Sequence, residues 1–131
     1  MKTLQQIMDH VAAQLLKQGR RSTSNGHDCV YRAPDGCKCA AGHLIDDQFY
    51  HPSFERRAVP QPFSSMGDAH KTMVEAFVNS GVDLHDREVY HLVHALQRVH
   101  DGYEPNQWRR KLHDVARRFN INCHTLNDAN H

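Results

Sequence analysis

The chain lacks any long run of apolar residues. A helix that spans a bilayer needs about 20 consecutive apolar residues, and no stretch of the 131 residues approaches that length. The first residues, Met-Lys-Thr-Leu-Gln-Gln, become polar too early for a secretory signal peptide. We therefore expect no contact with a membrane and a place in the cytoplasm.

The chain also lacks a strong net charge and the common catalytic motifs. Its formal charge is +1, which argues against a strongly basic nucleic-acid binder and against an acidic mimic of DNA. There is no glycine-rich phosphate loop, internal repeat or low-complexity segment, and no nucleophile with a clear base partner. These absences favour a protein without a catalytic centre.

What the chain does contain is a cysteine-rich segment among amphipathic helices. Three of the four cysteines lie between residues 29 and 39. In a reducing cytoplasm such a cluster indicates free thiols or a metal site rather than disulfides. The chain also carries twelve histidines, so its surface charge should respond to mild acidification.

Hydrophobic periodicity predicts four helices. The first ends at Gly19, the second runs from near Asp68 to Asn79, the third starts with Asp83 as its N-cap and stops at Gly102, and the fourth begins at Pro105. Their apolar stripes are Leu4, Ile7, Met8, Val11, Leu15 and Leu16; Met73, Ala76 and Phe77; Val89, Leu92, Val93, Leu96 and Val99; and Trp108, Leu112, Val115 and Phe119.

A β-hairpin is predicted around Ala33-Pro-Asp-Gly36, which suits a type I turn. If Gly36 forms a bulge, Ala33 pairs with Cys37 and Tyr31 with Cys39, and the side chain of Cys29 shares their face. A symmetric four-residue loop would instead turn Cys29 to the opposite face. Both registers remain open from the sequence.

The fold class expected from these elements is α+β and mostly helical. The order is an N-terminal helix, a β-hairpin, a short helix over residues 40–50, and then a three-helix unit. One domain over residues 1–131 accommodates all of it. Its parts are the N-terminal helix (1–21), a polar loop (22–28), the hairpin (29–40), the helical part (41–121) and a flexible tail (122–131).

Zinc is the cofactor that the cysteine cluster allows, although none is required. Thiolates and imidazole are preferred zinc ligands, and Cys29, Cys37, Cys39 and His43 would complete a tetrahedral set. Their spacing is not that of the common zinc fingers. The alternative is that the cysteines are small buried apolar side chains behind the hairpin.

A second hypothesis is a metal-dependent phosphohydrolase. The HD superfamily uses a helical histidine, a His-Asp pair and a later aspartate to bind metals that activate water. His70, His100 and Asp101 match the first three in order, with Asp114 or Asp128 as the last. Against this, His100 precedes Gly102, where the helix dipole alone favours a histidine.

Two charged helical faces are candidate binding surfaces. His91, His94, Glu88 and Arg98 share one side of a predicted helix, most simply a solvated face. A basic run on the last helix could contact phosphates, although few aromatic residues lie beside it in the sequence. Its members are Arg109, Arg110, Lys111, Arg117 and Arg118.

Several motifs together resemble a family of small uncharacterised proteins from tailed bacteriophages and prophages. The motifs are Gln18-Gly-Arg-Arg-Ser22, Cys29-x-Tyr-Arg-x3-Gly36, Cys39-Ala-x-Gly-x-Leu-Ile-x-Asp47, Tyr50, Leu96-Gln-x2-His-Asp101 and Trp108-x3-Leu112. The resemblance covers most of the chain, and it implies no established activity. It implies phage origin and action in the cytoplasm of a host bacterium.

Cys37 and His43 depart from the family pattern, which argues against a zinc site common to the family. The matching residues are then expected to be structural, with Arg32 paired to Asp46 or Asp47. The sequence thus favours a non-enzymatic phage accessory protein that binds a host or phage macromolecule, with a protein as the expected partner, for host takeover or anti-defence. A zinc-stabilised module that binds nucleic acid is a further alternative to the phosphohydrolase. The residues expected to be structural are Cys29, Tyr31, Arg32, Gly36, Cys39, Gly42 and Asp47.

Overall fold

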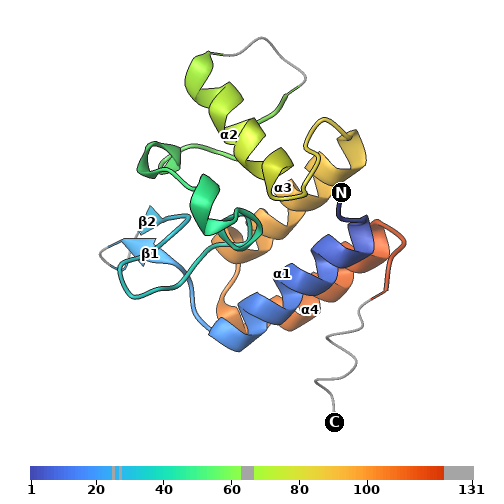
Figure 1. Ribbon diagram of the computed structural model, residues 1–131. Coiled ribbons are helices and arrows are strands. Elements are labelled where there is room, and N and C mark those ends of the chain that lie inside the picture. Colours follow the sequence, from blue (N-terminus) through green and yellow to red (C-terminus); the bar gives the residue numbers. More distant parts are fainter. Residues whose placement is uncertain (25, 27, 63–66, 123–131) are drawn as a thin grey trace.

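The computed structural model describes residues 1–24, 26, 28–62 and 67–122. It is an α+β protein and mostly helical, as the sequence predicts (Figure 1). The elements in chain order are α1 (Leu4–Gln18), β1 (Thr23–Ser24), β2 (Asp28–Cys29), the 3₁₀ turns η1 (Gly42–Leu44), η2 (Asp47–Phe49) and η3 (Pro52–Phe54), α2 (Asp68–Asn79), α3 (Arg87–Gly102) and α4 (Pro105–Arg118).

Local signals set both ends of α1. Thr3 and Gln6 form a capping box, in which each side chain accepts a hydrogen bond from the other residue's backbone N–H. Gly19 ends the helix in the left-handed conformation, with φ of 70°. The predicted stripe is confirmed at its centre, where Ile7 and Val11 are fully buried.

The helical core consists of α1, α3 and α4, which pack against one another. The sequence grouped α2 with the last two helices, whereas α2 packs against η3 and lies apart from α4 (Figure 1). The predicted stripes explain most of the core, since most of their members are buried, whereas Leu4, Leu16 and Phe119 are partly buried. The fully buried members include Ile7, Leu92, Leu96, Trp108 and Leu112.

The start of α3 corrects the sequence prediction by one turn. Asp86, not Asp83, is the N-cap, because its carboxylate accepts hydrogen bonds from the backbone N–H groups of Glu88 and Val89. Asp83 instead stabilises the preceding turn by accepting a hydrogen bond from the N–H of His85 at 3.0 Å. The other end of α3 lies at Gly102, as predicted.

The hairpin around Gly36 has the bulged register. The N–H of Ala33 donates to the carbonyl of Cys37 at 2.8 Å, and the N–H of Cys39 donates to the carbonyl of Tyr31 at 3.3 Å. Gly36 has φ of 92°, which accounts for glycine at this position. The pairing amounts to a single bridge between Arg32 and Lys38 rather than two full strands.

The named strands precede the hairpin around Gly36. β1 and the first residue of β2 lie in the segment predicted to be a polar loop, 22–28. β1 and β2 pair antiparallel, with Thr23 opposite Cys29 and Ser24 opposite Asp28. The N–H of Val30 extends this pairing by donating to the carbonyl of Ser22 at 3.0 Å. Cys29 therefore belongs to a different hairpin from Cys37, which the sequence placed on the same ribbon.

The short helix predicted over residues 40–50 is replaced by two 3₁₀ turns, η1 and η2. Long-range partners occupy the backbone groups that a continuous helix would use. The carbonyl of Ile45 accepts a hydrogen bond from Arg32 at 2.8 Å, and the N–H of Asp46 donates to Ser80 Oγ at 2.9 Å. Leu44 and Ile45 are nevertheless buried, as predicted.

None of the helices in the described part of the chain has the length and apolarity needed to cross a bilayer. The predicted flexible tail, 122–131, lies outside the described residues except for Asn122. The N–H of Asn122 donates to Gln5 Oε1 at 2.9 Å and so ties the end of the described chain to α1.

Candidate functional site

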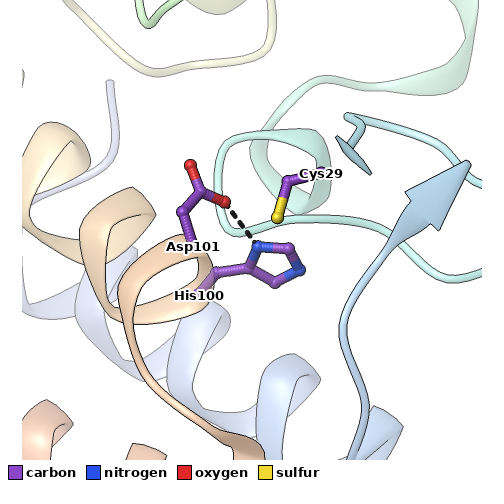
Figure 2. A group of neighbouring side chains, drawn as sticks. All are labelled: Cys29, His100 and Asp101. Atoms are coloured by element: carbon purple, nitrogen blue, oxygen red, sulfur yellow. Dashed lines mark hydrogen bonds and ion pairs between the residues drawn. The ribbon is translucent and has the colours of Figure 1, made fainter. Parts of the chain in front are cut away.

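Cys29, His100 and Asp101 form a cluster where β2 meets the end of α3. Figure 2 shows the three side chains pointing toward one another. One potential ligand atom from each lies within 4.8 Å of the other two. The sequence separation of about 70 residues concealed this arrangement, because the predicted hairpin directed Cys29 elsewhere.

Hydrogen bonds occupy both ring nitrogens of His100. The backbone N–H of Ser22 donates to Nε2 at 2.9 Å, so Nε2 must be unprotonated. Nδ1 therefore carries the proton of the neutral ring and donates it to Asp101 Oδ1 at 2.7 Å. The ring is fully buried and stacks on Trp108, with centroids 5.5 Å apart.

Asp101 is held as a carboxylate. Burial alone would raise the pKa of its carboxyl, but the hydrogen bonds from His100 and Gln97 outweigh burial and lower the pKa below its ordinary value. Gln97 Nε2 donates to both Asp101 oxygens, at 3.0 and 3.1 Å. The negative charge therefore stays beside the imidazole N–H throughout the neutral pH range.

Cys29 is held as a thiol. Burial and then the charge of Asp101, to which the thiol also hydrogen-bonds, raise the pKa of Cys29 to about 11. A thiol is a poor nucleophile and a poor metal ligand compared with a thiolate. In a cysteine–histidine pair the imidazole nitrogen must accept the thiol proton, and neither nitrogen of His100 is free to do so.

The cluster also fits a zinc ion poorly, although sulfur, nitrogen and carboxylate oxygen are all zinc ligands. A metal bound to Nδ1 would displace the only proton on the ring. That proton could move to Nε2 only if the buried hydrogen bond from Ser22 were broken. Metal binding would thus leave a buried N–H without a partner, which costs about 1–3 kcal/mol.

The predicted zinc set is not brought together. Among the described residues, only Cys29, His100 and Asp101 form a group of three or more His, Cys, Asp or Glu side chains with ligand atoms within 4.8 Å of one another. Cys39 is fully buried, its Sγ accepts a hydrogen bond from the N–H of Gly42 at 3.3 Å, and burial raises its pKa to about 12. Cys37 and His43 line a polar surface pocket instead.

The predicted hydrolase set is likewise dispersed. His70 lies on α2, where its Nε2 accepts a hydrogen bond from the backbone N–H of Gln61 at 3.1 Å, and it is not part of the cluster. Asp114 lies on α4 and pairs with Arg117 at 3.4 Å. Asp128, the other candidate for the last position, lies outside the described residues.

The ion pair predicted for Arg32 is confirmed, with Asp47 as its partner. Arg32 Nη1 lies 2.7 Å from Asp47 Oδ1, and Nη2 donates to the carbonyl of Ile45 at 2.8 Å. The guanidinium also lies over the Tyr50 ring, 4.4 Å from its centroid. Arg32 thus joins the bulged hairpin to η2, which is the structural role expected of it.

Glu55 is an important residue of this corner that the sequence did not reveal. Its Oε1 accepts a hydrogen bond from the N–H of Tyr31 at 2.8 Å, and its Oε2 accepts from the N–H of Arg32 and the hydroxyl of Tyr50. Glu55 lies in a proline-rich stretch without periodicity, so nothing in the sequence marked it. One carboxylate thereby satisfies three donors of the hairpin region.

Protonation of His43 should destabilise the protein. Burial, and then the positive charges of Lys38 and Arg32, lowers its pKa from 6.5 to about 4. The unfolded chain therefore binds a proton at a higher pH than the folded protein does. The contribution of neutral His43 to the free energy of unfolding is fully present above about pH 6.5. About 1–2 kcal/mol of it should be lost by about pH 4, after allowing for partial exposure.

Urea unfolding at a series of pH values measures this loss. In the neutral form, His43 Nε2 lies 3.1 Å from Gln18 Oε1, and a His43→Gln variant keeps a donor without the titration. The variant should lose about 1–2 kcal/mol less than the wild type between these pH values. Equal pH dependence in the two proteins would refute the assignment.

The members of the basic run on α4 differ in exposure. Arg110, Arg117 and Arg118 are exposed, whereas Arg109 and Lys111 are partly buried. Lys111 Nζ lies over the ring of Tyr103, 4.5 Å from its centroid. The structure thus supplies an aromatic neighbour that the sequence did not indicate, because Tyr103 lies in the connection between two helices.

The fold and the cluster together define a small, mostly helical α+β protein with a Cys–His–Asp group whose histidine is buried and held by internal hydrogen bonds. Comparison with known proteins adds no family: no protein-family model, no curated protein and no solved structure matches this chain. Its function must therefore be argued from its own residues.

Proposed function

We propose that this protein is a non-enzymatic accessory protein that binds a macromolecule through its exterior helical surface. The cysteine-rich hairpin region and the Cys29–His100–Asp101 cluster hold the framework together. Function then resides in the exposed faces of the helices, where charged side chains are free to meet a partner.

The observation that carries this proposal is the hydrogen bonding of His100. A general base needs a nitrogen that can accept a proton, and a metal ligand needs a free lone pair. Nε2 uses its lone pair for the N–H of Ser22, and Nδ1 uses its proton for Asp101. His100, the best candidate for a catalytic residue, therefore uses both ring nitrogens in hydrogen bonds that hold the fold together.

The phage setting rests on the resemblance noted in the sequence. The matching residues Tyr31, Arg32 and Asp47 all lie in the hydrogen-bonded corner beside η2. Such a motif is typical of a shared framework rather than of a shared reaction. On this basis we infer action in the cytoplasm of an infected bacterium, in host takeover or in opposition to host defence.

The metal-dependent phosphohydrolase is the competing function, and a hydrolysis assay distinguishes the two. Purified protein is incubated with Mn²⁺, Mg²⁺ or Zn²⁺ and an activated phosphodiester, beside an Asp101→Asn variant. We expect no turnover in either protein and no retention of metal after dialysis. Metal-dependent hydrolysis that is lost in the variant would contradict the proposal.

Capture from bacterial lysate tests the binding function itself. Immobilised wild-type protein is compared with a Lys111→Ala/Arg118→Ala variant, and the eluates are analysed for protein and for nucleic acid. The proposal predicts a macromolecule that the wild type retains in excess over the variant. Identical eluates would contradict binding through this surface.

A further inference from the structure

Positive side chains from two helices gather on one face of the protein. α3 and α4 pack side by side, and Arg98 and His94 are exposed on α3 while Arg118 is exposed on α4. We call this surface the α3–α4 basic face. Its cations are Arg98, Lys111 and Arg118, and beside them lie the rings of His91, His94, Tyr90 and Tyr103.

A shallow groove runs between the two helices on this face. It has a volume of about 180 Å³, and its floor is formed by Ala95, Val99 and Val115. Lys111 and Arg118 line the same groove from α4. An extended chain could therefore lie along an apolar floor with cations beside it.

Aromatic rings lie toward both ends of the face. Tyr103 is 36% exposed and carries Lys111 over its ring. Tyr90 stacks against His94, with centroids 5.9 Å apart. The two tyrosines are separated by 13 positions, most of them within α3, which corresponds to about 20 Å along the helix. The cations of the face thus lie between two aromatic residues, over a length of several nucleotides.

Arg98 and Arg118 lie close enough to His94 to affect its protonation. Burial, then the charges of Arg98, His91 and Arg118, lowers the pKa of His94. The carboxylate that lines the groove belongs to Asp114, and it is paired with Arg117. A phosphate entering the groove would therefore meet Lys111 and Arg118 beside this ion pair.

We propose that the α3–α4 basic face binds single-stranded nucleic acid. Phosphates lie against Lys111, Arg118 and Arg98, and unpaired bases stack on the tyrosine rings. The inference rests on the proposed binding function and names its partner class. A duplex keeps its bases stacked on one another and would leave the rings unused, and an acidic protein would need the cations alone.

Fluorescence anisotropy with labelled oligonucleotides of about 12 nucleotides tests the proposal. Oligo-dT and oligo-U distinguish DNA from RNA, and a duplex and poly-glutamate serve as competitors. Binding should weaken with added salt, and Lys111→Ala/Arg118→Ala should weaken it about tenfold and reduce the salt slope by about 1.4. Lys17→Ala/Lys71→Ala, which removes two exposed positive charges elsewhere, should change neither value.

Two single variants separate stacking from charge. Tyr103→Ala should weaken binding about tenfold without changing the salt slope. Asp114→Asn removes the groove carboxylate and frees Arg117, so it should tighten binding, a gain that misfolding cannot produce. Thermal unfolding of each variant confirms that the fold is retained.

Absence of binding at low salt, equal losses in the Lys17→Ala/Lys71→Ala control, or more effective competition by duplex or poly-glutamate would overturn the inference. The proposed binding function would survive any of these results. It would instead fail if metal-dependent hydrolysis were found, so the two failures are distinguishable.

Discussion

Gly42→Ala should destabilise the protein by about 3 kcal/mol or more, making it one of the most damaging single-methyl additions available in this chain. A Cβ at residue 42 would overlap the carbonyl oxygen of Tyr31 and lie 3.1 Å from the carbonyl carbon of that residue. It would also lie 3.3 Å from Lys38 Cβ. The obstacle is backbone, which cannot move without breaking the hydrogen bond from the N–H of Cys39 to that same oxygen.

Two other glycines provide matched controls for this substitution. Gly102→Ala adds the same methyl at an open position and should change stability by less than about 0.5 kcal/mol. Gly36→Ala also meets no atom but retains a φ of 92°, so it should cost about 1 kcal/mol through strain alone. Chemical denaturation of the three variants measures the order. A Gly42→Ala cost no larger than that of Gly102→Ala would contradict the close approach of η1 to the hairpin.

His100→Ala should lower the free energy of unfolding by about 3–5 kcal/mol. The substitution opens a cavity against Trp108 and leaves the buried N–H of Ser22 without an acceptor. It also removes the donor that stabilises the Asp101 carboxylate. Since small domains are stable by only about 5–15 kcal/mol, the variant should be close to the limit of folding.

The exposed His94 on the same helix is the control for His100. His94→Ala removes the same side chain and should cost less than about 1 kcal/mol. Thermal and urea unfolding, repeated with and without added Zn²⁺, give the comparison. Similar costs at the two positions, or a wild-type stability that rises with Zn²⁺ only when His100 is present, would contradict a structural role for this residue.

The helices were predictable because their signals are local. Thr3 and Gly19 delimit α1 through their own side chain and φ angle, and the apolar stripes repeat at helical spacing. The start of α3 was misplaced because two aspartates, Asp83 and Asp86, both suit an N-cap. Asp86 accepts hydrogen bonds from the first N–H groups of the helix, whereas Asp83 accepts one from His85 in the turn before it.

The cluster at Cys29 could not be predicted from local signals. Its members are brought together by the pairing of β1 with β2 and by the packing of α3, both of which are long-range. The bulged register around Gly36 was anticipated as one of two alternatives, but the ribbon ends near Tyr31 and Cys29 pairs with Thr23 instead. Two-residue strands leave no periodicity in a sequence, so the segment read as a loop.

Glu55 and Tyr103 were missed for a related reason. Each lies in a connection between elements, where a single charged or aromatic residue is common and carries no pattern. Their importance comes from distant partners, namely the backbone of Tyr31 for Glu55 and the ammonium of Lys111 for Tyr103. These long-range contacts cannot be read from the sequence.

The tautomer of His100 is the most direct test of the account. Long-range ¹H–¹⁵N NMR of protein labelled at histidine resolves the two ring nitrogens, and an His100→Gln variant assigns the signal. The hydrogen bonds from Ser22 and to Asp101 predict a neutral ring protonated at Nδ1, unchanged by added Zn²⁺. A ring protonated at Nε2, or an Nδ1 signal that shifts with stoichiometric Zn²⁺, would show that this histidine is a ligand or a base rather than part of the framework.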